Sequence, residues 1–117
     1  MTDLTQLYLV IGYLILMLAL SWWFYKKPPK NINLFYGYRT SRSMKNQQTW
    51  DEANRYSAIF SLRLNLYCLA LPFIGYVLYP EHNILVSLLA HALLLILIIV
   101  YTEAHLKARF DADGHPK

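Results

Sequence analysis

The residues best placed to do chemistry are three ionisable side chains in or beside long apolar runs: Arg63, His91 and Glu103. An imidazole titrates near neutral pH, so His91 could pass a proton along a relay. The alternative is a neutral histidine that bonds to a backbone carbonyl freed by Pro72, which is expected at the same depth. We favour the second interpretation, because no acidic residue is expected at that depth in any helix.

Arg63 requires a partner or a wet surrounding, because a guanidinium buried in hydrocarbon is costly. The short connection 80–83 makes the apolar runs on either side of it antiparallel neighbours, which brings Arg63 within one helical turn of the level of Glu103. We therefore predict an Arg63–Glu103 ion pair. Two alternatives stay open: the Arg63 side chain could extend to the lipid headgroups, or it could act as a ligand or relay.

The sequence lacks the patterns that support catalysis or metal binding. It contains no Ser-x-x-Lys or Gly-x-Ser-x-Gly nucleophile motif and no glycine-rich phosphate loop. His82, His105 and His115 lack the spacing of metal ligands, and the single cysteine, Cys68, has no second cysteine for a redox or zinc site. The sequence predicts a protein that is not an enzyme and has no metal or cofactor.

The composition indicates an integral membrane protein. Hydrophobic residues make up 56% and charged residues 15% of the 117 residues, whereas about a quarter of a soluble chain is charged. Three apolar runs approach the ~20 residues that cross a hydrocarbon layer. We predict an all-α, single-domain protein, residues 1–117, with transmembrane helices at 4–25, 57–79 and 84–102. The first should be retained, because it is too long for a signal peptide and no basic residue precedes it.

The distribution of Lys and Arg predicts the orientation. These residues gather in the loop 26–56 and in the tail 103–117, whereas the amino terminus and the connection 80–83 carry none. Positive residues are retained on the cytoplasmic side. We therefore predict an external amino terminus and a cytoplasmic carboxyl terminus. This retention explains the net charge of +4, so no nucleic-acid partner is predicted.

The loop 26–56 is expected to have an interfacial part and a helical part. Apolar and aromatic residues in 31–38 predict a segment in the headgroup region, and Gly37 permits a turn conformation. The next helix should begin at Ser41 or Ser43, or at a capping box with Thr49 as N-cap, in which Glu52 reaches back to the Thr49 amide.

The second helix is expected to pack through one small and polar face. Pro72 predicts a kink in this helix near the middle of the membrane, and Asn65 is interpreted as an interhelical hydrogen-bonding group. The polar end of the tail, residues 111–117, is predicted to fray. The face that should pack against another helix comprises Trp50, Ala53, Asn54, Ser57 and Ser61.

One ordered set of residues in the loop closely resembles the signature of the SdpI family of bacterial membrane proteins. It comprises Tyr36-Gly37-Tyr38-Arg39-Thr40, Ser43-Met44-Lys45, Trp50 and Ala53-Asn54-Arg55-Tyr56. As in that family, the motif lies in the loop that leads into the next transmembrane helix. The family's namesake is larger, and this chain resembles its carboxyl-terminal, three-helix part alone.

The resemblance implies a location in the bacterial inner membrane and a role in immunity or signalling. The family's namesake protects against a secreted toxin peptide and, in signalling, holds a transcriptional repressor at the membrane. The implied partners are a toxin peptide or a cytoplasmic regulator, together with membrane lipids. The implied functional residues are Gly37, Arg39, Thr40, Ser43, Lys45, Trp50, Ala53 and Asn54.

Other interpretations remain for these residues and for the whole chain. Arg39, Arg42 and Lys45 could serve topology and contact with anionic lipids, and Trp50 could be an interfacial anchor. Instead of an immunity protein, the chain could be an accessory subunit of a larger membrane complex or a small transporter. A homo-oligomer is compatible with three helices, since three helices bury little area among themselves.

Overall fold

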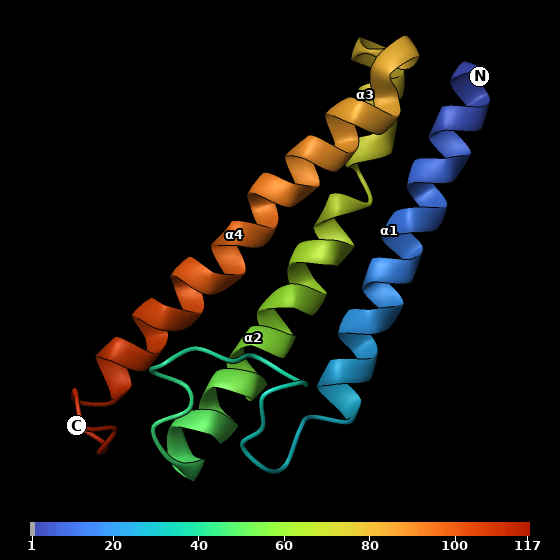
Figure 1. The fold of residues 1–117 in the computed structure, drawn as a ribbon. Coiled ribbons are helices and arrows are strands. Elements are labelled where there is room, and N and C mark those ends of the chain that lie inside the picture. The colour runs from blue at the N-terminus through green and yellow to red at the C-terminus, as the bar shows by residue number, and fades with distance from the viewer. Residues whose placement is uncertain (1) are drawn as a thin grey trace.

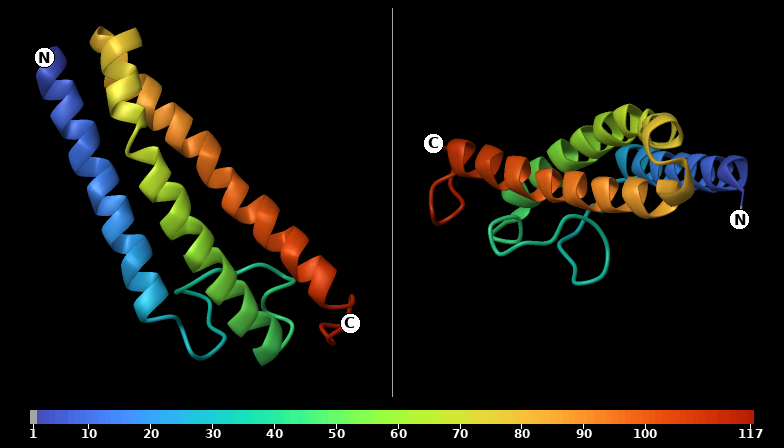
Figure 2. Two further views of the ribbon diagram at one scale, coloured as in Figure 1. Left: turned by 180° about the vertical axis from the view of Figure 1, so that it is seen from behind. Right: turned by 90° about the horizontal axis from the view of Figure 1, so that it is seen from above.

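The computed structural model describes residues 2–117, and the elements assigned in them are helical (Figure 1). α1 spans Asp3–Lys26, α2 Gln47–Cys68, α3 Leu71–Leu78 and α4 Asn83–Arg109, with a short 3₁₀ helix, η1, at Pro80–His82. The bundle is elongated, with extents of 53 × 23 × 20 Å. α1, α2 and α4 lie side by side, each packed against the other two, and the two ends of the chain lie at opposite ends of the bundle (Figures 1 and 2).

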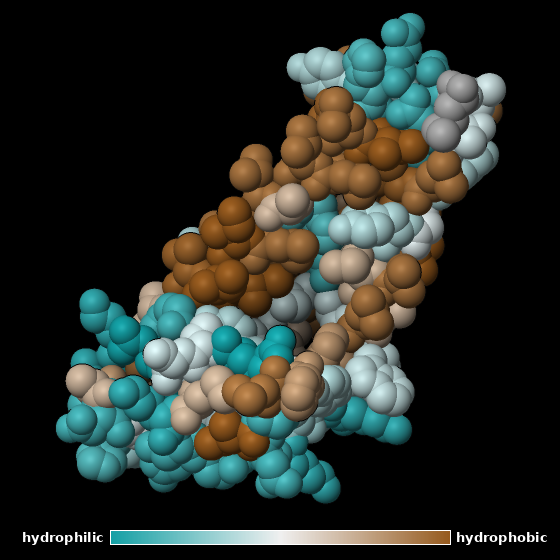
Figure 3. Space-filling model, in the orientation of Figure 1, coloured by the Kyte–Doolittle hydropathy of each residue, from teal (hydrophilic) through white to brown (hydrophobic). Residues whose placement is uncertain are grey.

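Three helical segments are long and apolar enough to cross a membrane: Asp3–Lys26, Gln47–Leu78 and Pro80–Arg109. Apolar side chains cover the middle of the bundle on the face seen in Figure 3, and polar side chains gather at its two ends. Many of the exposed large side chains are Leu and Ile, whereas several buried ones are polar. The structure therefore confirms the predicted all-α fold with three potential membrane-spanning helices.

The predicted kink at Pro72 is a full break between α2 and α3. The last turn of α2 tightens, since the amides of Leu69 and Ala70 bond to carbonyls only three residues back. α3 then starts with Pro72 in its first turn, a position that needs no amide donor. The Asn83 side chain donates to the Pro72 carbonyl at 2.9 Å, which holds the base of α4 against α3.

The predicted start of the second helix was wrong. α2 begins at Gln47, and its N-cap is Asn46 rather than Ser41, Ser43 or Thr49. The Asn46 side chain accepts the Thr49 amide at 2.9 Å, and the Thr49 hydroxyl accepts the Asn46 amide at 3.1 Å. Thr49 therefore occupies the N3 position of a capping box rather than its N-cap position.

The prediction of a fraying tail was also wrong. α4 continues to Arg109, beyond the predicted end at residue 102, and Phe110 is buried against it. The tail then turns back, with the Lys117 amide donating to the Arg109 carbonyl at 2.9 Å. Amides of His115 and Asp113 donate to the Asp111 carboxylate and hold its pKa below the usual value. The Gly114 carbonyl accepts from the Asn46 side chain at 2.7 Å, which ties the tail to the N-cap of α2.

Candidate functional site

The loop 27–46 lies on one side of the bundle, at the end where α1 stops and α4 finishes (Figures 1 and 2). Its first half closes on itself. The Tyr36 ring stacks on Phe24 with centroids 5.1 Å apart, and the Tyr36 hydroxyl donates to the Lys27 carbonyl at 2.6 Å. The Asn33 side chain accepts the Tyr36 amide at 2.7 Å. These contacts lead the chain towards α2 and α4, where most of the predicted motif residues converge.

Gly37 lies close against the Asn54 side chain. Gly37 has a φ of +102°, a conformation that residues with a side chain rarely adopt. A Cβ at this position would lie 2.5 Å from the Asn54 Oδ1 and 2.5 Å from the Pro29 ring. The Asn54 Oδ1 accepts the Tyr38 amide at 2.6 Å, while its Nδ2 donates to the Trp50 carbonyl at 3.0 Å. The carboxamide of Asn54 thus fixes the loop backbone on α2, and only glycine leaves room for it.

Thr40 and Ser43 form a tight turn after Tyr38. The Thr40 amide donates to the Ser43 Oγ at 2.8 Å, and the Ser43 amide donates to the Thr40 Oγ1 at 3.1 Å. This is the reciprocal pattern of a capping box, but no helix follows it. Ser43 is fully buried, and its carbonyl accepts the Thr49 hydroxyl at 3.0 Å, so the turn is connected to the first turn of α2.

Trp50 and Ala53 are buried parts of the protein interior. Trp50 is 0% exposed, and its Nε1 donates to the Pro29 carbonyl at 2.9 Å. The alternative that Trp50 anchors the protein at the membrane interface is therefore wrong. Ala53 is also 0% exposed and packs with Leu106 of α4 and with Phe110, which follows this helix. The predicted packing face of the second helix is confirmed by the burial of Trp50, Ala53, Asn54 and Ser57.

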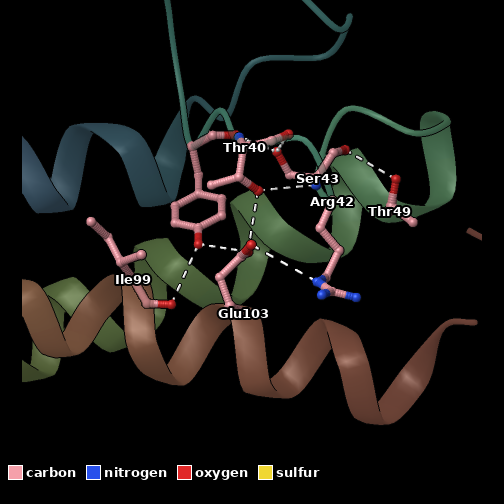
Figure 4. A network of polar contacts seen from close by, with 7 residues as sticks. Thr40, Arg42, Ser43, Thr49, Ile99 and Glu103 are labelled. Carbon is pink, nitrogen blue, oxygen red and sulfur yellow. Dashed lines mark hydrogen bonds and ion pairs between the residues drawn. The ribbon is translucent and has the colours of Figure 1, made fainter. Parts of the chain in front are cut away.

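The Glu103 carboxylate of α4 contacts several polar side chains of the loop (Figure 4). The Tyr38 hydroxyl donates to its Oε2 at 2.8 Å, and the Thr40 hydroxyl donates to the same oxygen at 3.1 Å. The Arg42 Nε lies 3.9 Å from its Oε1, a long ion pair. Burial of the phenol, followed by its hydrogen bond to Glu103 and the charge of that carboxylate, raises the pKa of Tyr38 well above its usual value.

The predicted Arg63–Glu103 ion pair was wrong. The loop folds back over α4, so Tyr38 and Thr40 donate hydrogen bonds to the Glu103 carboxylate and Arg42 pairs with it. Arg63 is exposed and borders a shallow hollow with Tyr56, Ile59 and Phe60 of α2 and His105 of α4. Sequence reasoning missed the role of Arg42. Comparing the depths of residues on neighbouring helices could not reveal Arg42 as a partner of Glu103, because Arg42 lies in a loop with no periodic pattern.

The motif cations Arg39 and Lys45 differ from the buried motif residues, because both are exposed. Arg39 is exposed, and its guanidinium donates to the Leu34 carbonyl within the same loop. Lys45 is exposed, and no ion pair of its side chain is present among residues 2–117. The site is therefore a docked loop whose buried motif residues bond to one another or pack on α4, with Arg39 and Lys45 exposed on its outer side.

A second polar cluster ties the three long helices together inside the bundle. The fully buried His91 of α4 contacts the Asn65 Oδ1 of α2 through its Nε2 at 2.8 Å and the Tyr13 hydroxyl of α1 through its Nδ1 at 3.0 Å. The Asn65 Nδ2 donates to the Ser21 Oγ at 2.5 Å. A carboxamide oxygen only accepts, so the Nε2 of His91 carries the proton. The Nδ1 of a neutral His91 then accepts a hydrogen bond from the Tyr13 hydroxyl.

The predicted bond between His91 and a carbonyl freed by Pro72 is therefore wrong, because both ring nitrogens have side-chain partners. The interpretation of Asn65 as an interhelical hydrogen-bonding group is confirmed by its bonds to α1 and α4. A further bridge joins α2 and α4 near the docked loop, where the Glu52 Oε2 lies 2.7 Å from the His105 Nε2. No cluster of three metal-ligating side chains is present among residues 2–117.

Comparisons with known proteins identify the same segment. The family model described as the SdpI/YfhL protein family matches residues 30–102, which include most of the loop, α2, α3 and most of α4. The "Uncharacterized protein YfhL" of Bacillus subtilis (strain 168) is 71% identical over 31 residues, which are 26% of this chain and 28% of that relative. The match therefore covers well under two thirds of the relative's length. No solved structure matches the chain.

Proposed function

Because the chain belongs to the SdpI/YfhL protein family, we propose that it is a non-catalytic protein of the bacterial inner membrane that acts in immunity to a secreted toxin peptide or in membrane signalling. Its three potential membrane-spanning helices support a multi-pass membrane protein. The proposal concerns the end of the bundle where the loop docks. There the partner is a toxin peptide or a cytoplasmic regulator.

The observation that carries this proposal is the construction of the docked loop. The buried motif residues bond to one another or pack on α4, so they hold a single loop conformation. Such a site presents a fixed surface. Rigid presentation lowers the entropy lost when a partner binds. In this proposal Arg39 and Lys45 contact the partner, and Gly37, Thr40, Ser43, Trp50, Ala53 and Asn54 position the surface.

The test is a toxin challenge of cells in which the gene is deleted and then restored as wild type or as a variant. We expect deletion to sensitise the cells and Arg39→Ala to restore little protection, although the variant protein reaches the membrane in normal amounts. Lys107→Ala is the matched control, because this exposed cation of α4 lies outside the motif, and it should protect fully. Unchanged growth of the deletion strain under challenge would reject the immunity role.

The signalling role has its own test. Pull-down of the wild-type protein after toxin exposure should recover a cytoplasmic regulator, and Arg39→Ala with Lys45→Ala should recover less of it than Lys107→Ala does. Equal recovery by the double variant and the control would mean that the outer cations of the loop are not the contact surface.

A further inference from the structure

A cleft of about 280 Å³ lies between α1, α2 and α4, in the half of the bundle next to the loop. Met17, Leu20 and Phe24 of α1 and Leu95 and Ile98 of α4 form its apolar walls. The third wall is the small and polar face of α2, and Pro29, Gly37 and Tyr38 border the loop end. On the face seen in Figure 3, pale and polar atoms lie in a recess between apolar side chains of the bundle.

The cleft is suited to a hydrocarbon chain rather than to water. Its walls are mainly apolar, and the two carboxamides among its lining residues already have partners, since Asn54 bonds to the Tyr38 amide and Asn65 to Ser21 and His91. A bound water needs two to four polar partners. An empty cleft would leave the lining atoms without neighbours. Within the membrane-spanning part of the bundle, the molecules that can enter this cleft from the side are lipids.

The charge at the loop end of the cleft selects among lipids. Between residues 26 and 50 the chain carries six cations and no carboxylate: Lys26, Lys27, Lys30, Arg39, Arg42 and Lys45. Of these, Arg42 is paired with Glu103. Cations next to a spanning helix attract anionic headgroups. A chain lying along the cleft would place its headgroup at this end.

We propose that the cleft is a binding site for one acyl chain of an anionic phospholipid, whose headgroup lies against the loop cations. The site goes beyond the immunity or signalling role, because it is occupied in the absence of any toxin or regulator. The lipid then fills the space beneath Gly37 and Tyr38, and its loss would loosen the docked loop.

The experiment uses the full chain in nanodiscs that contain equal amounts of phosphatidylglycerol and phosphatidylcholine. Native mass spectrometry after gentle release should detect one retained phosphatidylglycerol, in several-fold excess over phosphatidylcholine. Equal retention of the two lipids, which indicates surrounding bilayer only, would overturn the proposal. So would retention of detergent alone.

Variants locate the lipid. Ser61→Phe projects a ring into the cleft from α2 and should abolish the retained lipid, and Ser61→Leu should reduce it. Ala92→Phe is the matched control, because this exposed residue of α4 does not line the cleft, and it should retain the lipid as wild type does. Circular dichroism and gel filtration check that each variant is folded. Retention by both Ser61 variants would contradict the site.

A charge variant keeps the proposal testable if both Ser61 variants misfold. Lys30→Gln with Arg39→Gln leaves the cleft open but removes two cations from its loop end. We expect a retained lipid whose preference for phosphatidylglycerol falls towards that for phosphatidylcholine. An unchanged preference would contradict the headgroup contact.

Discussion

Asn54 holds the loop backbone through a single carboxamide. It accepts the Tyr38 amide and donates to the Trp50 carbonyl, and it is only 5% exposed. Asn54→Ala would leave a buried amide without a partner, which costs about 1–3 kcal/mol. We expect a lower Tm in detergent micelles and faster proteolysis of the loop. Gln48→Ala, an exposed position of the same helix, should leave both unchanged, and a Tm equal to that of wild type for Asn54→Ala would show that the bond contributes little.

Gly37 and Gly12 provide a matched pair of glycine substitutions. Gly37→Ala imposes a left-handed conformation that costs roughly 1–2 kcal/mol and places a methyl group against Asn54 and Pro29. We expect a clear loss of thermal stability and of toxin protection. A Cβ at Gly12 meets nothing within 4 Å, so Gly12→Ala in α1 should keep or slightly raise the Tm. Equal effects of the two changes would contradict the tight contact at Gly37.

Tyr38 gives the docked loop an alkaline pH dependence. Its pKa is raised in the folded protein, so the stabilisation is present below the usual pKa of about 10 and is lost as the pH rises through the folded pKa. Glu103→Gln removes the neighbouring negative charge and should lower the pKa of Tyr38. The measurement is the tyrosinate absorbance of each protein minus that of its Tyr38→Phe version. Glu81→Gln, in η1, should not move the curve.

At this scale the sequence predicted which residues form the site better than what they contact. The spacing of Gly37, Thr40, Trp50 and Asn54 identified the motif through its resemblance to a family. Their partners include Pro29, just before the motif, and Glu103, far from it in sequence. The sequence carries no periodic signal for such contacts, because the loop forms neither a helix nor a strand.

The polar cluster of Tyr13, His91 and Asn65 joins α1, α2 and α4 inside an apolar bundle. Hydrogen bonds between helices in a membrane contribute about 0.6 kcal/mol on average and up to about 1.7. We expect Tyr13→Phe to destabilise the folded protein within this range, as measured by unfolding in mixed micelles. Tyr8→Phe is the matched control, because Tyr8 is exposed on the same helix. A double-mutant cycle with Asn65→Ala should show coupling, and additive effects would mean that His91 does not connect the two.

At the scale of the helices, apolar run length predicted the three long helical segments, and Pro72 predicted a kink where the structure has a break between α2 and α3. The ends were less predictable. Ser41, Ser43, Asn46 and Thr49 all have side chains that can cap a helix. The structure uses Asn46, whose Nδ2 also bonds to the Gly114 carbonyl of the tail. The extension of α4 to Arg109 likewise depends on contacts of Leu106 and Phe110 with Ala53.

For the whole molecule, the placement of Lys and Arg predicts an external amino terminus and a cytoplasmic loop and tail. Cysteine labelling tests this orientation in a Cys68→Ala background. The Asp3→Cys variant should react with a membrane-impermeant maleimide on intact spheroplasts, and the Lys117→Cys variant should react only after lysis. The reverse pattern would invert the topology and would place the docked loop on the outer side.

Composition predicted the class of the molecule because the bilayer imposes strong constraints on length and polarity. It could not predict that the loop between α1 and α2 docks on α4. That contact joins residues 63 and 65 positions apart, and it depends on the side chains of one threonine, one tyrosine and one glutamate. These bonds join the loop to α4 at one end of the bundle.

The dependence of the loop on Glu103 also orders the biogenesis of the protein. Tyr38 and Thr40 leave the ribosome well before Glu103, which at about 5–20 residues per second takes roughly 3–13 seconds longer to synthesise. During that interval the motif has its α2 partners but lacks the carboxylate that receives its hydroxyl groups. A chain truncated before Glu103 would keep an undocked, cation-rich loop accessible to proteases. Docking of the loop on α4 therefore requires synthesis of the chain at least as far as Glu103.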